Sequence, residues 1–217
     1  MRSWLPSAVA PSLFFAAMFW VASFAAAGEF NTVLSIGDAA PAWKDLPGVD
    51  EKNHSLADLK TPIVVVAFTC NTCEYSKDYE DRLIALTQKY SGEGSKVSVV
   101  AINVNPGKYE HLSAMEVRAG EKNFNFPYLY DASQQIARDY GAVWTPEFFV
   151  LNAERKIVYM GALDDNTDPD QVNNQWVDKA IIATLDGGAP ETKETAARGC
   201  AIKFNAERKR ERKPAKE

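Results

Sequence analysis

The chain has 217 residues, of which 46% are hydrophobic and 24% charged, so it holds enough apolar material for one sizeable core. Its formal net charge of -5 argues against a general nucleic-acid binder. We find no internal repeat and no sign of a second core, and we expect one domain over residues 35–186.

The N-terminal stretch is a targeting segment. Residues 8–27 are almost wholly apolar, Arg2 precedes them, and small alanines close the run. This pattern predicts a secretory signal peptide over residues 1–27. The alternative is an uncleaved anchor, since the run approaches the roughly 20 residues that a membrane span needs. We expect a periplasmic or otherwise exported protein, in contact with the membrane only if the segment is not cleaved.

Two cysteines separate a predicted strand from a predicted helix. The unbroken β-branched run 63–68 is typical of a strand buried on both faces. From residue 74 to 90, apolar and aromatic residues recur every three or four positions and predict one helix face: Tyr75, Tyr79, Leu83, Leu86 and Tyr90. Cys70 and Cys73 therefore lie at the helix N-terminus, where unpaired N–H groups favour a thiolate. This placement indicates thiol–disulfide chemistry.

The remaining pattern alternates strands and helices. Further strands are predicted over residues 97–104, 126–130, 147–151 and 156–160, and further helices over 109–122, 134–140 and 170–185. Alternation implies parallel strands with helical crossovers, while the final hairpin adds antiparallel strands. We therefore expect an α/β protein with a mixed central sheet and helices on both faces.

The chain continues beyond the predicted closing helix. Residues 187–217 form a C-terminal extension that begins with glycines and a proline and ends in a tail rich in Arg and Lys. Because glutamates interleave with these bases, we interpret the tail as solvated. The alternative is contact with anionic lipid or with a partner.

This order of elements resembles the three-layer thioredoxin-like fold. More narrowly, it resembles the exported TlpA-like proteins and the alkyl hydroperoxide reductase/thiol-specific antioxidant (redoxin) group. The motifs that carry the resemblance are the lead-in Gly37-Asp38-x-x-Pro41, Cys70-x-x-Cys73, the extra segment 105–140, and Trp144-Thr145-Pro146. The resemblance implies that Pro146 is cis and that Thr145 and Pro146 bind the substrate strand. Residues 199–204 also look like the terminal segment of some redoxin relatives.

Two departures from the family patterns narrow the expected activity. Thr69 stands where thioredoxins usually have Trp, and Cys70 stands where peroxiredoxins have Thr. We therefore expect a dithiol oxidoreductase acting on protein thiols and disulfides together with a redox partner protein. The alternatives are a thiol-dependent peroxidase and a non-catalytic redoxin-like binding module.

Each candidate residue has an expected role. Cys70 should attack, because it lies at the helix start and should be the more exposed of the pair, and Cys73 should resolve the mixed disulfide. Glu147 is either a proton acceptor near Cys73 or a solvent-facing strand residue. Cys200 is a free thiol, a bond to another chain, or a third redox partner reached through a flexible linker over residues 187–190. The alternative is a segment packed on the domain surface, with Ile202 and Phe204 buried and the thiol idle.

We expect no cofactor and no metal. Structural zinc needs four ligands, and the chain has only three cysteines and two histidines without ligand-like spacing.

Overall fold

The computed structural model describes residues 28–206. The predicted signal peptide or anchor and the basic tail lie outside the described residues. Within residues 28–206, no helix is both long enough and apolar enough to cross a membrane.

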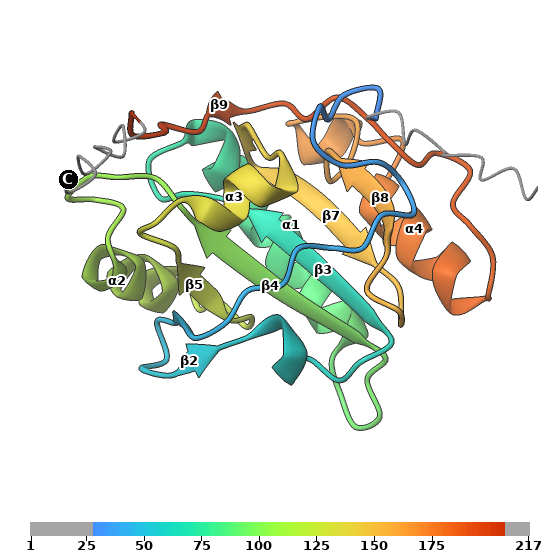
Figure 1. Cartoon of the computed structure of the whole chain (residues 1–217), viewed down its shortest axis with the longest axis horizontal. Helices are drawn as coiled ribbons and strands as arrows, with labels where there is room; N and C mark the ends of the chain where they lie inside the picture. The colour runs from blue at the N-terminus through green and yellow to red at the C-terminus, as the bar shows by residue number, and fades with distance from the viewer. Residues whose placement is uncertain (1–27, 207–217) are drawn as a thin grey trace, which may run out of the picture.

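A five-stranded mixed sheet forms the centre of the domain (Figure 1). Its strands, in spatial order, are β5 (Tyr128–Tyr130), β4 (Val97–Asn103), β3 (Ile63–Phe68), β7 (Glu147–Leu151) and β8 (Ile157–Gly161). β3, β4 and β5 are parallel, whereas β7 and β8 are antiparallel to their neighbours. Every residue of β3 and β7 is buried, because these strands are covered on both faces. The predicted mixed sheet is confirmed.

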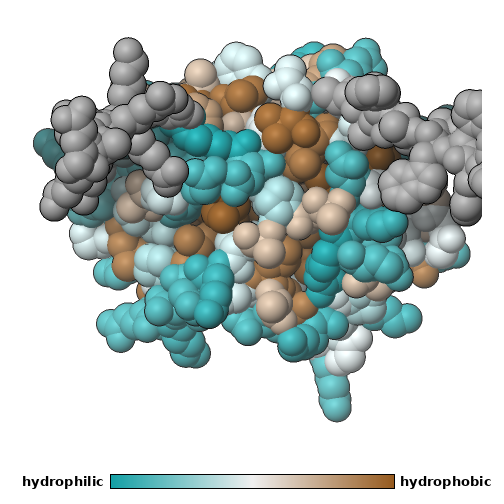
Figure 2. Space-filling model, viewed as in Figure 1, coloured by the Kyte–Doolittle hydropathy of each residue, from teal (hydrophilic) through white to brown (hydrophobic). Residues whose placement is uncertain are grey.

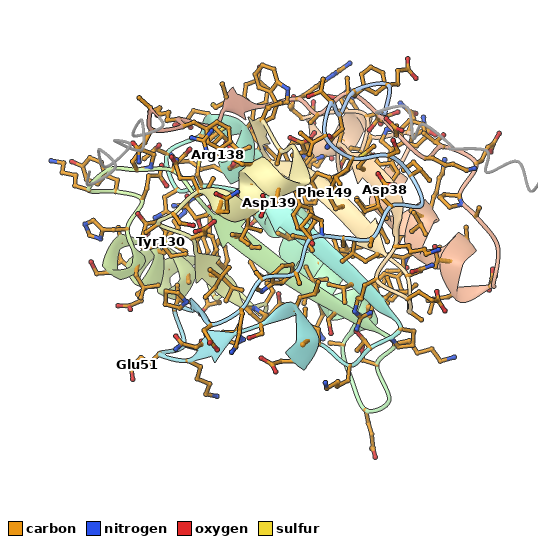
Figure 3. The ribbon with its side chains drawn as sticks, in the orientation of Figure 1. Asp38, Glu51, Tyr130, Arg138, Asp139 and Phe149 are labelled. Carbon is orange, nitrogen blue, oxygen red and sulfur yellow. The ribbon has the colours of Figure 1, made fainter. Side chains whose placement is uncertain are left out.

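Helices cover both faces of this sheet and create two cores. α1 (Glu74–Tyr90), α2 (Leu112–Lys122) and α4 (Trp176–Leu185) contribute to the first core, which receives alternate β3 side chains such as Val65. α3 (Gln135–Tyr140) contributes to the second, on the opposite face. There the Tyr140 ring meets the rings of Phe68 and Phe149 at centroid distances of 5.4 and 5.1 Å. Phe149 is seen at the centre of the sheet in Figure 3. The three-layer thioredoxin-like architecture is confirmed.

Short elements complete the domain. They are β1 (Leu46–Pro47), β2 (Asn53–His54), the 3₁₀ turns Leu56–Asp58 and Pro169–Gln171, β6 (Trp144–Thr145) and β9 (Cys200–Ala201).

On the face shown in Figure 2, apolar residues gather near the top and are bordered by polar residues.

Two sequence predictions about helices are wrong in detail. The predicted helix 170–185 is a 3₁₀ turn followed by α4, because the Asp165 carboxylate accepts hydrogen bonds from Asn173 N and Asn174 Nδ2 and holds the intervening loop extended. Tyr75 is not a core residue, because 42% of it is exposed.

The C-terminal segment packs on the domain. Lys193 and Thr195 hydrogen-bond to the backbone of Met160 in β8, and β9 pairs with β6. Figure 1 shows this segment running along the top of the molecule, above the start of α1. The expectation that a flexible linker sets the reach of Cys200 is therefore wrong, because packing places this residue.

Candidate active site

The cysteine pair lies in the turn between β3 and α1, as predicted. Cys73 is the N-cap residue of α1, with extended backbone angles. Cys70 and Cys73 are free thiols that are only 3% and 2% exposed. The expectation that Cys70 is the more exposed of the two holds only by one percentage point, and both side chains are buried.

Thr145 brings the loop before Pro146 against both sulfurs. The Thr145–Pro146 peptide bond is cis, as the resemblance implies. The Thr145 hydroxyl lies 3.3 Å from Cys70 Sγ, and its carbonyl oxygen lies 3.0 Å from Cys73 Sγ. Residues 75 positions apart in sequence thus form one cluster around the two thiols.

Glu110 fixes the two residues between the cysteines, and sequence reasoning missed it. Its buried carboxylate accepts hydrogen bonds from the backbone N–H groups of Asn71 and Thr72, at 2.8 and 3.1 Å, and from the Thr72 hydroxyl at 2.5 Å. Asn103 Nδ2 donates to the same carboxylate at 2.9 Å. The backbone donors that would otherwise be available to a Cys70 thiolate are therefore engaged by a fixed anion.

A side chain and a backbone carbonyl from the extra segment 105–140 hold the same turn. Tyr128 Oη donates to Asn71 Oδ1 at 3.0 Å, and Asn71 Nδ2 donates to the Tyr109 carbonyl at 2.8 Å. A chain insertion between the two halves of the fold thus shapes the CxxC turn.

Hydrogen bonding separates the pKa values of the two thiols. The pKa of Cys73 is lowered to about 4, chiefly because the Cys70 thiol donates to its sulfur. Donation from the Cys200 thiol and the Ser76 amide lowers this pKa further, whereas burial of Cys73 raises it. The pKa of Cys70 is raised by that same bond, by burial and by the charge of Glu110. The Thr145 carbonyl opposes a thiolate at Cys73, but several donors outweigh one acceptor. The resting thiolate is therefore favoured at Cys73.

Glu147 is buried and supports the loop before Pro146. Its Oε2 accepts hydrogen bonds from the backbone N–H groups of Val143 and Trp144, at 2.9 and 3.1 Å. Burial raises the pKa of this carboxyl, while the two amide bonds act in the opposite direction. With 6% exposure it is not a solvent-facing strand residue.

Comparison with protein families matches residues 36–160 to the AhpC/TSA family. This match covers the cysteine turn, the inserted segment and the cis-proline loop. The chain belongs to the AhpC/TSA family.

Solved structures share the fold of this chain. An uncharacterized conserved protein from Geobacillus kaustophilus is 32% identical, with a TM-score of 0.74, over 81% of this chain and 95% of that chain. A hypothetical protein from Sinorhizobium meliloti is 31% identical, with the same TM-score, over 81% and 98%. An exposed lipoprotein thioredoxin from Streptococcus pneumoniae shares the fold at 21% identity, with a TM-score of 0.52, over 68% and 99%. No curated protein gives a significant match.

Cys200 joins the cysteine pair of this redoxin from the far end of the chain. The residue is partly exposed, and its thiol lies near enough to Cys73 for each thiol to shift the pKa of the other. Burial, followed by the interaction with Cys73, raises the pKa of Cys200. Among residues 28–206, no group of three or more His, Cys, Asp or Glu side chains is placed to hold a metal ion.

Proposed function

We propose that this redoxin is an exported thiol–disulfide oxidoreductase that exchanges disulfides with protein thiols through Cys70 and Cys73. The observation that carries the proposal is the contact of Thr145 with both sulfurs, at 3.3 and 3.0 Å, directly before a cis proline. Export is supported by the apolar run at residues 8–27.

The proposed chemistry is two successive thiol–disulfide exchanges. A thiolate of the pair attacks a partner disulfide, which forms a mixed disulfide and releases one partner thiolate. The second cysteine of the pair then attacks the first, which closes the Cys70–Cys73 disulfide and releases the second partner thiol. The partner gains two electrons and the pair loses them, and the reverse sequence oxidises a partner. We propose Cys73 as the resting thiolate, in place of the expected Cys70.

A protein substrate fits the surroundings of the pair. Trp144 precedes Thr145 and is 40% exposed, and the neighbouring Val143 is 45% exposed. These apolar side chains offer contact area to a partner chain beside the cis-proline loop. We propose that the loop binds an extended partner segment through the backbone of Thr145 and Pro146 when β9 is released from β6.

Serine variants test the proposal. Reduction of insulin disulfides by dithiothreitol should be accelerated by the wild type and not by Cys70→Ser or Cys73→Ser. Ala85→Ser adds a hydroxyl on the exposed side of α1 and should stay within about twofold of wild type. Activity at the wild-type rate in both cysteine variants would refute the proposal.

Parallel assays separate the alternatives. Consumption of hydrogen peroxide with dithiothreitol that survives loss of Cys70 would identify a peroxidase instead. A pair that stays in one redox state across a glutathione buffer series would identify a non-catalytic binding module.

A further inference from the structure

The chain's own C-terminal segment occupies the cis-proline loop. β9 pairs antiparallel with β6, so that Cys200 lies opposite Thr145. Ile202 N donates to the Val143 carbonyl at 2.9 Å, and the Thr145 hydroxyl donates to the Cys200 carbonyl at 3.3 Å. Segment 199–205, which contains β9, thus lies along the edge that the proposed function gives to a partner segment.

Gly199 shows that the approach of this segment is close. A Cβ at this position would lie 2.1 Å from the Thr145 carbonyl oxygen and 3.1 Å from Pro146 N. A residue without a side chain is therefore required where the strand reaches the loop.

Polar and apolar contacts hold the strand beyond Cys200. Buried Gln134 donates to the Lys203 carbonyl at 3.0 Å and accepts from Asn205 N at 2.7 Å, and Ile202 is only 6% exposed in the second core. Arg138 donates to the Asn205 carbonyl at 2.9 Å and lies over the Phe204 ring at 4.4 Å. Figure 3 shows Arg138 on α3 near the edge along which the segment runs. The strand is docked by specific contacts along its length.

The three sulfurs differ in their access to the surface. Cys70 and Cys73 are buried, whereas Cys200 is partly exposed. Cys200 lies opposite Thr145, and Thr145 contacts both sulfurs of the pair. With the strand docked, a protein disulfide can approach Cys200 more readily than either sulfur of the pair.

We propose that Cys200 is a third redox cysteine that relays disulfide exchange between protein partners and the buried Cys70–Cys73 pair. This inference rests on the proposed function.

Three exchanges complete the relay, each forming one S–S bond and breaking one. The Cys200 thiolate attacks a partner disulfide, forms a mixed disulfide and releases the first partner thiol. Cys73 then attacks Cys200 Sγ, forms a Cys73–Cys200 disulfide and releases the second partner thiol. Finally Cys70 attacks Cys73 Sγ, so that the Cys70–Cys73 disulfide forms and the Cys200 thiol is restored. The partner disulfide is reduced by two electrons, the pair is oxidised, and no further oxidant is needed.

A trapping experiment tests the middle step. The reduced Cys70→Ser protein is treated with oxidised glutathione, acid-quenched, digested without reductant and mapped by mass spectrometry. The relay predicts a Cys73–Cys200 peptide as the main product. Cys73 found only as its glutathione adduct, with Cys200 free, would overturn the proposal.

A rate measurement tests the whole relay with insulin as the probe disulfide. Cys200→Ser should slow oxidation of the reduced protein at least about tenfold, because the proposed intramolecular step is lost. Ala196→Ser places the same hydroxyl at an exposed position of the preceding segment, and its oxidation rate should stay within about twofold of the wild-type rate. Ile202→Ala loosens the strand without removing the thiol and should also slow the reaction.

The outcomes distinguish the relay from the proposed function. An unchanged or faster rate in Cys200→Ser would overturn the relay, and a faster one would show that the strand only blocks the site. If Cys70→Ser and Cys73→Ser also kept the wild-type rate, the proposed function itself would be wrong.

Discussion

The carbonyl oxygen of Thr145 lies 3.0 Å from Sγ of Cys73, although the hydrogen bonds around Cys73 favour its thiolate. A carbonyl oxygen accepts from a thiol and repels a thiolate, so this contact becomes less favourable when the thiol loses its proton. The protonation state of Cys73 is therefore linked to how tightly the cis-proline loop closes on the pair.

The first prediction concerns the stability of the reduced protein against pH. The pKa of Cys73 is lowered from 9.0 to about 4, so between these values the unfolded chain binds one more proton at this position. The free energy of unfolding should therefore rise with pH across this window, by at most about 1.4 kcal/mol per pH unit, and this contribution is lost as pH falls through about 4. Urea unfolding at pH 5 and pH 8 should show a larger gain in wild type than in Cys73→Ser. Equal gains would contradict the assignment of the thiolate.

The second prediction concerns Glu110. Its charge helps to raise the pKa of Cys70, and its carboxylate engages the amides of Asn71 and Thr72. Glu110→Gln should lower the pKa of Cys70 and speed its alkylation by iodoacetamide at neutral pH, followed by peptide mass spectrometry. It should also lower the free energy of unfolding by about 1–3 kcal/mol, because charged hydrogen bonds are lost.

A matched control lies on the next helix. Glu116→Gln makes the same change at an exposed position of α2 and should alter neither quantity. If Cys70 were alkylated at the wild-type rate in both variants, the charge of Glu110 would have no role in setting the pKa of Cys70.

The third prediction separates support from proton transfer at Glu147. A glutamine oxygen can accept the same bonds from Val143 and Trp144 without a buried charge. Glu147→Gln should therefore keep turnover and stability, whereas Glu147→Ala should lose about 1–3 kcal/mol of unfolding free energy, because two amides lose their acceptor. Burial raises the pKa of Glu147, so the folded protein holds this proton more tightly than the unfolded chain. The free energy of unfolding of the wild type should therefore fall as pH rises above about 4.5, whereas that of Glu147→Gln should lack this fall. A folded Glu147→Gln without turnover would instead support the proton-acceptor role.

Regular local patterns explain which elements were predictable. β3 coincides with the continuous apolar run over residues 63–68, and α1 coincides with the helical repeat of apolar residues over 74–90. Both patterns follow directly from which side chains are buried, so they can be recognised in the sequence. The helix predicted over 170–185 does not form over its whole length, because the Asp165 carboxylate accepts hydrogen bonds from residues 173 and 174. The spacing of apolar residues gives no sign of these hydrogen bonds.

The candidate site was predictable only where a motif marks it. The CxxC motif and the Thr-Pro pair are visible in sequence, whereas Glu110 is one of many acidic residues and meets Asn71 across 39 positions. Cys200 could be flagged as an odd cysteine, but its contact with Cys73 depends on docking of β9 on β6, a pairing of two short strands. Such tertiary contacts are set by packing and not by local propensity.

The last prediction tests whether close approach at Gly199 is what places Cys200. In Gly199→Ala, the added carbon would lie 2.1 Å from the Thr145 carbonyl oxygen, so β9 must move away from β6. Residues 199–205 should then gain amide hydrogen exchange and protease cleavage, and the Cys73–Cys200 product in the Cys70→Ser background should fall. Gly188→Ala is the control, because its new carbon would have only an ordinary contact of 3.5 Å. Unchanged protection and cross-linking in Gly199→Ala would show that the strand tolerates a shift at this point, and that the contacts of Gln134 and Ile202 suffice to hold the thiol beside Cys73.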